Sequence, residues 1–175
     1  MITRLDFLIL DFIQTYLRTD MGDSIMSFIT RLGDGGMIWI VAAIIMLFFK
    51  KTRKAGICIA AALALTAFVG NTVLKNVFAR IRPYIEADFS IIIGAPGGYS
   101  FPSGHTGSSF AAATVLAFAF KKYSVIFYTL AALIGFSRAY LYVHYPTDII
   151  AGAVLGIVFG LVCIKGIFGV SYGKK

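Results

Sequence analysis

Apolar residues fill long stretches of the chain from residue 35 onward, and short basic or glycine- and proline-containing segments separate these stretches. A helix needs roughly 20 residues, within a range of about 17 to 25, to cross the bilayer core. Four of the five stretches have that length, and the first is slightly shorter. The pattern predicts an all-α integral-membrane bundle with about five transmembrane helices, over residues 35–49, 55–78, 104–120, 123–143 and 148–167.

The first 33 residues follow a different pattern, typical of amphipathic helices. Between residues 23 and 32 one face is formed by Ile25, Phe28, Ile29 and Leu32, and the other by Asp23, Ser27, Thr30 and Arg31. Residues 2–18 also carry a polar stripe, so we expect both segments to lie in the membrane interface. The alternative for residues 2–18 is a tilted, weakly apolar span. We interpret residues 1–175 as one domain, with interfacial helices over 1–33 and the transmembrane bundle over 35–170.

Composition agrees with a membrane protein, since 59% of the residues are hydrophobic and only 14% are charged, against roughly 25% charged in soluble domains. The net charge of +8 would suggest nucleic acid in a soluble protein. Here the basic residues cluster at the ends of apolar stretches, where membrane topology explains them, and we expect no nucleic-acid partner. Cys58 and Cys163 fall inside apolar stretches and are interpreted as core residues.

Charge also predicts the orientation. Basic residues at 50–54, at Lys121-Lys122, and at Lys165, Lys174 and Lys175 share one side of the membrane if there are five spans. Because positive residues favour the cytoplasm, the segments 79–103 and 144–147 are expected to face outward. The chain is therefore predicted to be a multi-pass protein of the cell membrane with its polar clusters on the extracytoplasmic face.

Three such clusters carry candidate chemistry. In the first, Lys75 and Arg82 are seven positions apart and share a face if the helix continues that far. Cations at the end of an apolar span are costly and usually functional. In the second, Ser103 follows Pro102 at a predicted helix start, where free backbone N–H groups favour an anion. Gly104 lets a ligand approach the backbone, and His105 follows it.

The third cluster contains Arg138, His144 and Asp148. Pro146 is expected to open the last helix, which puts Asp148 in its first turn and His144 just before it. A carboxylate beside one imidazole nitrogen fixes the tautomer and makes the other nitrogen a better nucleophile. Asp148 can also simply complement the helix dipole, and both interpretations can hold.

Together these residue types suit transfer of a phosphoryl group. Lys75, Arg82 and Arg138, with the backbone N–H groups of Ser103 and Gly104, can surround its oxygens. His144 would attack phosphorus and His105 would protonate the leaving oxygen. Metal ligation is the weaker alternative, because the chain shows neither zinc-type spacing nor a carboxylate cluster. We expect no metal and no cofactor.

At this point the chain resembles the type 2 phosphatidic acid phosphatase family. The signature of that family matches Lys75…Arg82-Pro83, then Pro102-Ser103-Gly104-His105, then Ser137-Arg138…His144…Asp148. The resemblance implies a helical bundle, a histidine nucleophile at His144, an acid at His105, support from Asp148 and no metal. It also implies phosphate binding by Lys75, Arg82, Ser103, Gly104 and Arg138. Many bacterial relatives have six spans, and this chain is expected to lack the first.

The predicted function is therefore metal-independent dephosphorylation of a membrane lipid phosphate or diphosphate through a phosphohistidine. Candidate substrates are phosphatidylglycerol phosphate, undecaprenyl pyrophosphate, phosphatidic acid and a lipid A phosphate. The sequence does not distinguish among them, and it assigns no oligomeric state and no role to Glu86 or Asp88. Two alternatives are a lipid or ion transporter that binds its cargo at the basic site and a vanadate-dependent enzyme resembling haloperoxidases.

Overall fold

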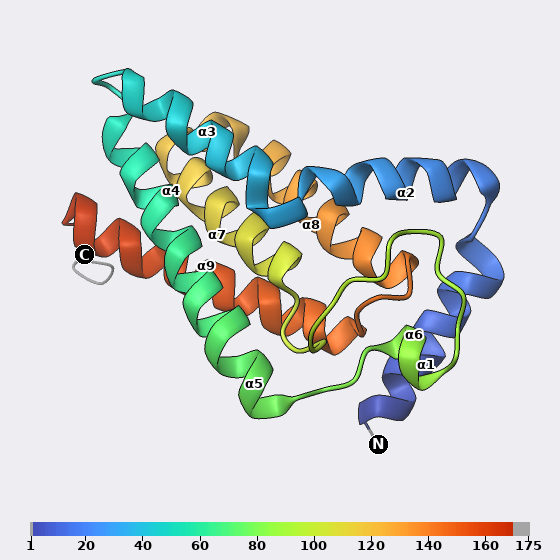
Figure 1. Cartoon of the computed structure of the whole chain (residues 1–175). Helices are drawn as coiled ribbons and strands as arrows, with labels where there is room; N and C mark the ends of the chain where they lie inside the picture. Colours follow the sequence, from blue (N-terminus) through green and yellow to red (C-terminus); the bar gives the residue numbers. More distant parts are fainter. Residues whose placement is uncertain (1, 170–175) are drawn as a thin grey trace.

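The computed structural model describes residues 2–169, and every regular element within that range is helical (Figure 1). The α-helices are α1 (Ile2–Phe12), α2 (Asp20–Leu32), α3 (Met37–Phe48), α4 (Arg53–Thr66), α5 (Lys75–Phe78), α6 (Pro83–Glu86), α7 (Gly104–Ala119), α8 (Ser124–Tyr140) and α9 (Pro146–Phe168). A π-helical segment, Ala67–Leu74, joins α4 to α5. The expectation of an all-α protein is confirmed for this range.

Each of the five predicted apolar stretches forms helix. The second consists of α4, the π-helical segment and α5 in succession, and the others correspond to α3, α7, α8 and α9. Three helical segments in the described part of the chain are long and apolar enough to cross a membrane, namely Asp20–Phe48, Arg53–Glu86 and Pro146–Phe168. The chain is a membrane protein. The shorter α7 and α8 have 16 and 17 residues.

Helix α7 lies at the centre of the bundle, in contact with α4, α8 and α9. Its contact with α9 is close because Gly152, Gly156 and Gly160 recur every four residues and face α7. Small residues at this spacing let the backbones of two membrane helices approach closely. In lipid no hydrophobic effect drives helices together, so this close packing is what makes them associate. The unpaired Cys58 and Cys163 are buried in the apolar core around these helices.

The two faces predicted for α2 are only partly right. Ile29 and Leu32 of the predicted apolar face pack against the core, whereas Ile25 and Phe28 of the same face are exposed. Thr30, assigned to the polar face, is buried. The reason is that its hydroxyl accepts a hydrogen bond from the buried guanidinium of Arg138, a partner more than 100 residues away that helical periodicity cannot reveal.

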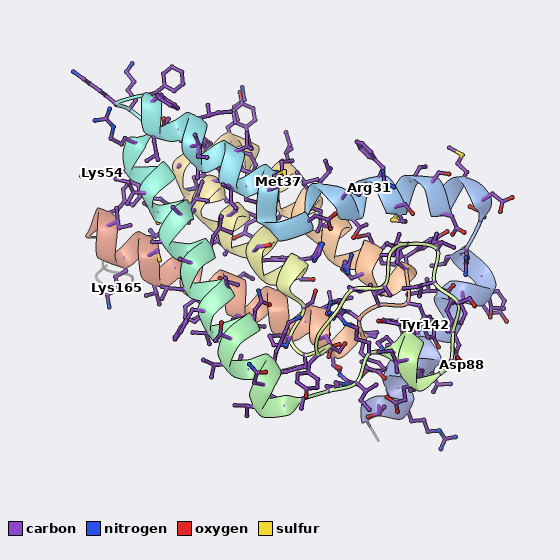
Figure 2. The ribbon with its side chains drawn as sticks, in the orientation of Figure 1. Arg31, Met37, Lys54, Asp88, Tyr142 and Lys165 are labelled. Atoms are coloured by element: carbon purple, nitrogen blue, oxygen red, sulfur yellow. The ribbon has the colours of Figure 1, made fainter. Side chains whose placement is uncertain are left out.

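The charged ends of the bundle are separated. Figure 2 shows Lys54 and Lys165 near one end of the molecule and Asp88 and Tyr142 near the opposite end. The basic segment between α3 and α4 and the last turn of α9 thus lie far from the loops that contain the candidate chemistry. This distribution is the one that the charge pattern of the sequence predicts.

The glycine contact between α7 and α9 generates a stability prediction. A Cβ added at Gly156 would overlap the carbonyl oxygen of Gly107 and lie 2.8 Å from the backbone nitrogen of Ala111. Since backbone atoms cannot move aside as a flexible side chain can, Gly156→Ala should lower the free energy of unfolding by about 1–3 kcal/mol. Denaturation of the purified protein in detergent measures the change.

Gly166→Ala is the matched control on the same helix. A Cβ at Gly166 meets no atom within 4 Å, and alanine forms helix better than glycine by about 1 kcal/mol. This variant should be as stable as the wild type or more so. Equal destabilisation by both substitutions would show that the α7–α9 contact is not as close as described.

Candidate functional site

A cavity of about 590 Å³ opens among α3, α4, α7 and the loops at one end of the bundle. Its polar end contains six of the eight residues predicted from the sequence: Lys75, Arg82, Gly104, His105, Arg138 and His144. Its other end is a slot lined by apolar side chains of α3 and α4, among them Ile40, Ala43, Ile44, Leu47, Ala60, Leu63 and Ala64. The remaining two predicted residues, Ser103 and Asp148, are buried behind the polar end.

Lys75 and Arg82 both reach the cavity, but not along one helical face. Helix α5 ends at Phe78 because Ala79 adopts a left-handed conformation, with φ of 44°. Arg82 follows in extended backbone, immediately before Pro83 opens α6. The condition for a shared helical face is therefore not met, because no single helix carries both cations. The chain turns instead and returns Arg82 to the cavity from the loop.

His144 is held in one tautomer by its neighbours. Arg82 Nη1 lies 3.1 Å from His144 Nε2. A guanidinium has no acceptor, so it donates this hydrogen bond and Nε2 must be the nitrogen with the lone pair. The proton is then on Nδ1, which lies 3.3 Å from Ser100 Oγ and 3.5 Å from Asp148 Oδ2.

The buried position of His144 also sets its charge. Removal from water lowers the pKa of His144 to about 3, and the nearby Arg138 and Arg82 act in the same direction, while Asp148 opposes them. The imidazole is consequently neutral at physiological pH. Its Nε2 lone pair is available for any electrophile that displaces the Arg82 hydrogen bond.

Asp148 is completely buried, and its carboxylate is satisfied on both oxygens. Oδ1 accepts from Arg80 Nη1 at 2.7 Å. Oδ2 accepts from the backbone N–H of Tyr145 at 3.0 Å and from the hydroxyl of Ser100. Ser100 therefore lies between Asp148 and the imidazole of His144. The predicted meeting of His144 and Asp148 across the helix start is found, with Ser100 as an added bridge.

Arg80 extends this network to α1. Its Nη2 donates to Asp6 Oδ2 at 2.7 Å, and its guanidinium lies 3.7 Å from the ring centre of Tyr145. Asp6, itself buried, also accepts from the backbone N–H of Thr147 at 3.0 Å. The first helix is thereby fixed to the start of α9. The sequence analysis assigns no role to Arg80 or Asp6, because no spacing links α1 to the last helix.

Arg138 is 3% exposed and donates through Nη1 to Thr30 of α2. Its Nε is buried and has no hydrogen-bond partner within residues 2–169. A buried donor without a partner is unfavourable by about 1–3 kcal/mol. Since Arg138 lines the cavity, an anion bound there would have an unused donor beside it.

Ser103 and Gly104 begin α7 as predicted, with the Ser103 hydroxyl oxygen capping the backbone N–H of Thr106. The backbone N–H of Ser103, however, donates to the Asp148 carbonyl at 3.0 Å. The expectation that this N–H faces a phosphate is therefore wrong, and only the hydroxyl proton of Ser103 is left for that purpose. Gly104 admits a close neighbour, since a Cβ there would lie 2.8 Å from Asn71 Oδ1.

His105 lines the same cavity as His144. Its Nε2 lies 2.8 Å from Asp34 Oδ1, in the turn between α2 and α3. Sequence reasoning missed Asp34, which lies 71 positions earlier.

The two acidic residues of the 79–103 segment lie away from this cavity. Glu86 accepts a hydrogen bond from the hydroxyl of Tyr145, and Asp88 is exposed in a left-handed turn. Neither is among the lining residues. In the region the structure covers, no three His, Cys, Asp or Glu side chains gather as a metal site would require.

The arrangement therefore combines two distinct halves. At the polar end three cations surround two histidines, and no carboxylate lines the described cavity. Such a set binds a multiply charged oxyanion, because arginine offers paired donors and lysine a point charge. The apolar slot that continues from the polar end has a lining suited to a hydrocarbon chain.

Comparison with known proteins agrees with this description. Residues 55–171 match the model of the PAP2 superfamily. The chain is 33% identical to "Undecaprenyl-diphosphatase" from Sulfolobus acidocaldarius over 77% of this chain and 65% of that protein. It is 35% identical to "Lipid A 4'-phosphatase" from Porphyromonas gingivalis over 70% of this chain and 58% of that protein. The matches thus span less than two thirds of the length of these two relatives.

A solved structure shows the same fold across nearly the whole chain. It is the transmembrane PAP2 type phosphatidylglycerolphosphate phosphatase from Bacillus subtilis, with a TM-score of 0.78, 26% identity, and coverage of 98% of this chain and 89% of that one. The family match covers all three motifs, whose residues meet at one cavity. The chain belongs to the PAP2 superfamily, the type 2 phosphatidic acid phosphatases that its motifs resemble.

Proposed function

We propose that this protein is a lipid phosphate phosphatase that works without a metal ion, through a phosphohistidine at His144. The observation that carries the proposal is the single cavity that joins a cationic, histidine-containing end to an apolar slot. A soluble phosphate ester needs only the first half. A phosphate at the end of a hydrocarbon chain uses both, because the chain is removed from water while the phosphate meets the cations.

The reaction begins when a phosphate group enters the polar end. Its oxygens take donors from Lys75, Arg138 and Arg82, and Arg82 then gives up its hydrogen bond to His144 Nε2. The freed lone pair attacks phosphorus. The bond from phosphorus to the lipid oxygen breaks, its electron pair stays on that oxygen, and His105 supplies the proton.

Hydrolysis of the intermediate reverses these roles. A water oxygen attacks phosphorus while His105 takes a proton from it. The phosphorus–nitrogen bond breaks, and its electron pair returns to Nε2 of His144. Asp148, through Ser100 and directly, keeps the Nδ1 proton in place during both steps. The hydroxyl of Ser103 and the backbone N–H of Gly104 complete the phosphate site at the start of α7.

The candidate substrates are phosphatidylglycerol phosphate, undecaprenyl pyrophosphate, phosphatidic acid and a lipid A phosphate. Relatives named for three of these lipid classes support the set. A transporter would place its polar residues near the membrane midplane between two repeats. The polar residues here gather instead where the loops and helix starts meet, at the end of the bundle opposite to Lys54 and Lys165.

For the membrane arrangement, we propose one domain with five spans: α3, the stretch from α4 to α5, α7, α8 and α9. Helices α1 and α2 lie in the interface, with the cavity open to the extracytoplasmic face of the cell membrane. The segregation of Lys54 and Lys165 from the cavity end supports this orientation. The last residues of the proposed domain, 170–175, lie outside the described part of the chain.

The first prediction from the proposed function concerns the nucleophile and the acid. The wild type should release phosphate from a lipid phosphate in EDTA, and His144→Ala should be inactive on every substrate. His105→Ala should lose about 10²–10⁴-fold on a lipid ester, and less on nitrophenyl phosphate, whose leaving group needs little protonation. Rapid quenching should trap an acid-labile phosphoprotein labelled at His144.

Three results would contradict these assignments. No phosphate release from any lipid phosphate would reject the phosphatase. Activity lost in EDTA and restored by magnesium would reject the metal-free mechanism. Label on His105, or label that persists in His144→Ala, would reverse the two histidines while leaving the phosphatase intact.

A second prediction tests the apolar slot. Ala64→Trp places an indole in the slot and should raise KM for a long-chain lipid phosphate about tenfold or more, because the chain loses its buried surface. Hydrolysis of nitrophenyl phosphate, which has no chain, should be unchanged. The control is Leu65→Trp, since its neighbour Leu65 is exposed and does not line the cavity. Equal effects of Ala64→Trp on both substrates would argue against the slot.

A third prediction tests the orientation. In a background of Cys58→Ala and Cys163→Ala, the single-cysteine variants Gly97→Cys and Lys51→Cys should react with an impermeant thiol reagent from opposite sides of the membrane. Both positions are exposed. Gly97→Cys should be labelled from outside, and Lys51→Cys only after the membrane is opened. The reverse pattern would invert the proposed topology.

A further inference from the structure

The turn between α2 and α3 lies directly against His105. Asp34 Oδ1 is 2.8 Å from His105 Nε2, and a Cβ at the preceding Gly33 would come within 2.9 Å of His105 Cδ2. The absence of a side chain at Gly33 therefore lets the turn approach the imidazole ring. An ionised carboxylate only accepts hydrogen bonds, so the proton of this contact belongs to Nε2.

The charges around His105 oppose protonation of its ring, except for Asp34. Lys75 of α5, Arg138 of α8 and Arg82 of the loop line the same cavity, together with the neutral His144. Nearby positive charges favour a neutral imidazole. No Asp or Glu lines the described cavity, and Asp34 sits just outside its rim with 59% of its side chain exposed. A general acid placed among three cations needs such a counter-charge to keep its proton.

We infer that Asp34 is a positioning residue that holds one proton on His105 Nε2, so that the charged ring presents its Nδ1 proton to the leaving group. The inference rests on the proposed function and assigns to the α2–α3 turn a role in the reaction. The three family motifs all lie beyond residue 74, so this residue belongs to none of them.

In the first step the bond from phosphorus to the lipid oxygen breaks, and the leaving oxygen takes the Nδ1 proton of His105, because the Nε2 proton stays in the hydrogen bond to Asp34. His105 becomes neutral, and Asp34 stays ionised throughout. In the second step Nδ1 recovers a proton from the attacking water, while Asp34 continues to accept the Nε2–H hydrogen bond. The same negative charge repels the phosphate dianion, so Asp34 favours proton transfer while weakening phosphate binding.

This opposition gives Asp34→Asn a distinctive result. Asparagine keeps a carbonyl oxygen for Nε2–H but removes the charge. If the titration midpoint of His105 falls by about one pH unit, the fraction of His105 that is protonated at pH values above the midpoint falls about tenfold. We expect kcat on a lipid phosphate to fall about tenfold and the alkaline limb of the pH profile to move to lower pH. Nitrophenyl phosphate should be affected less, and inorganic phosphate should inhibit at lower concentration.

Two further variants isolate the cause. Asp34→Ala removes the hydrogen bond as well as the charge and should reduce kcat more than Asp34→Asn. Asp20→Asn makes the same change at an exposed acid in the first turn of α2, outside the cavity, and should match the wild type in every measurement. A purely structural role for Asp34 would lower activity equally on both substrates and would not shift the pH profile.

NMR provides a test that does not depend on turnover. The chain has only two histidines, so His144→Asn leaves His105 as the single labelled imidazole in detergent. Adding Asp34→Asn to this background should lower the titration midpoint of His105 by about one pH unit. An unchanged midpoint, or lipid kinetics that match those of Asp20→Asn, would overturn the inference. A wild type that releases no phosphate would reject the proposed function instead, and the NMR result would still decide the contact.

Discussion

The buried carboxylate of Asp148 is the interaction on which the geometry of the site depends. An ionised carboxylate is several kcal/mol too costly in the interior unless charges and hydrogen bonds replace its water. Here the replacements come from separate segments: Arg80 after α5, Ser100 before α7, and His144 with Tyr145 before α9. The requirement to satisfy one carboxylate thus draws three loops to the first turn of one helix. His144 is oriented as a consequence, because it occupies the remaining side of the same group.

This constraint reaches further through Arg80, which Asp148 shares with Asp6. The first helix is therefore connected to the site through a guanidinium placed between two carboxylates. The backbone contributes as well, since the N–H of Ser103 donates to the Asp148 carbonyl and so fixes the start of α7 against the start of α9. The glycines of α9 permit that approach, because a Cβ at Gly152 would come within 2.5 Å of the Ser103 carbonyl oxygen. The close packing of α7 and α9 and the geometry of the site therefore depend on the same contacts.

Features that depend on residues close together in the sequence were predictable, whereas contacts between residues far apart in the sequence were not. The starts of α7 and α9 were predictable, because Ser103 and Pro146 act on the backbone within a few residues. The cavity residues were predictable because motifs with fixed spacing encode them. Asp34, Thr30 and Asp6 were not, since each meets its partner across more than 70 positions. Helical periodicity even placed Thr30 on the wrong face, because one buried hydrogen bond outweighed the preference of the surrounding pattern.

In the proposed mechanism, phosphate binding and activation of the His144 nucleophile are a single event. Arg82 donates to His144 Nε2, which protects the lone pair but also occupies it. The carbonyl oxygens of Gly97, Gly98 and Val143 hold the rest of this guanidinium, so the side chain is not free to swing away. Only an acceptor stronger than a neutral imidazole can take over that N–H without moving the arginine. A phosphate oxygen, being charged, is such an acceptor. Under the proposed mechanism, the His144 lone pair is therefore released where a phosphate has bound, whereas water, a weaker acceptor, leaves it engaged.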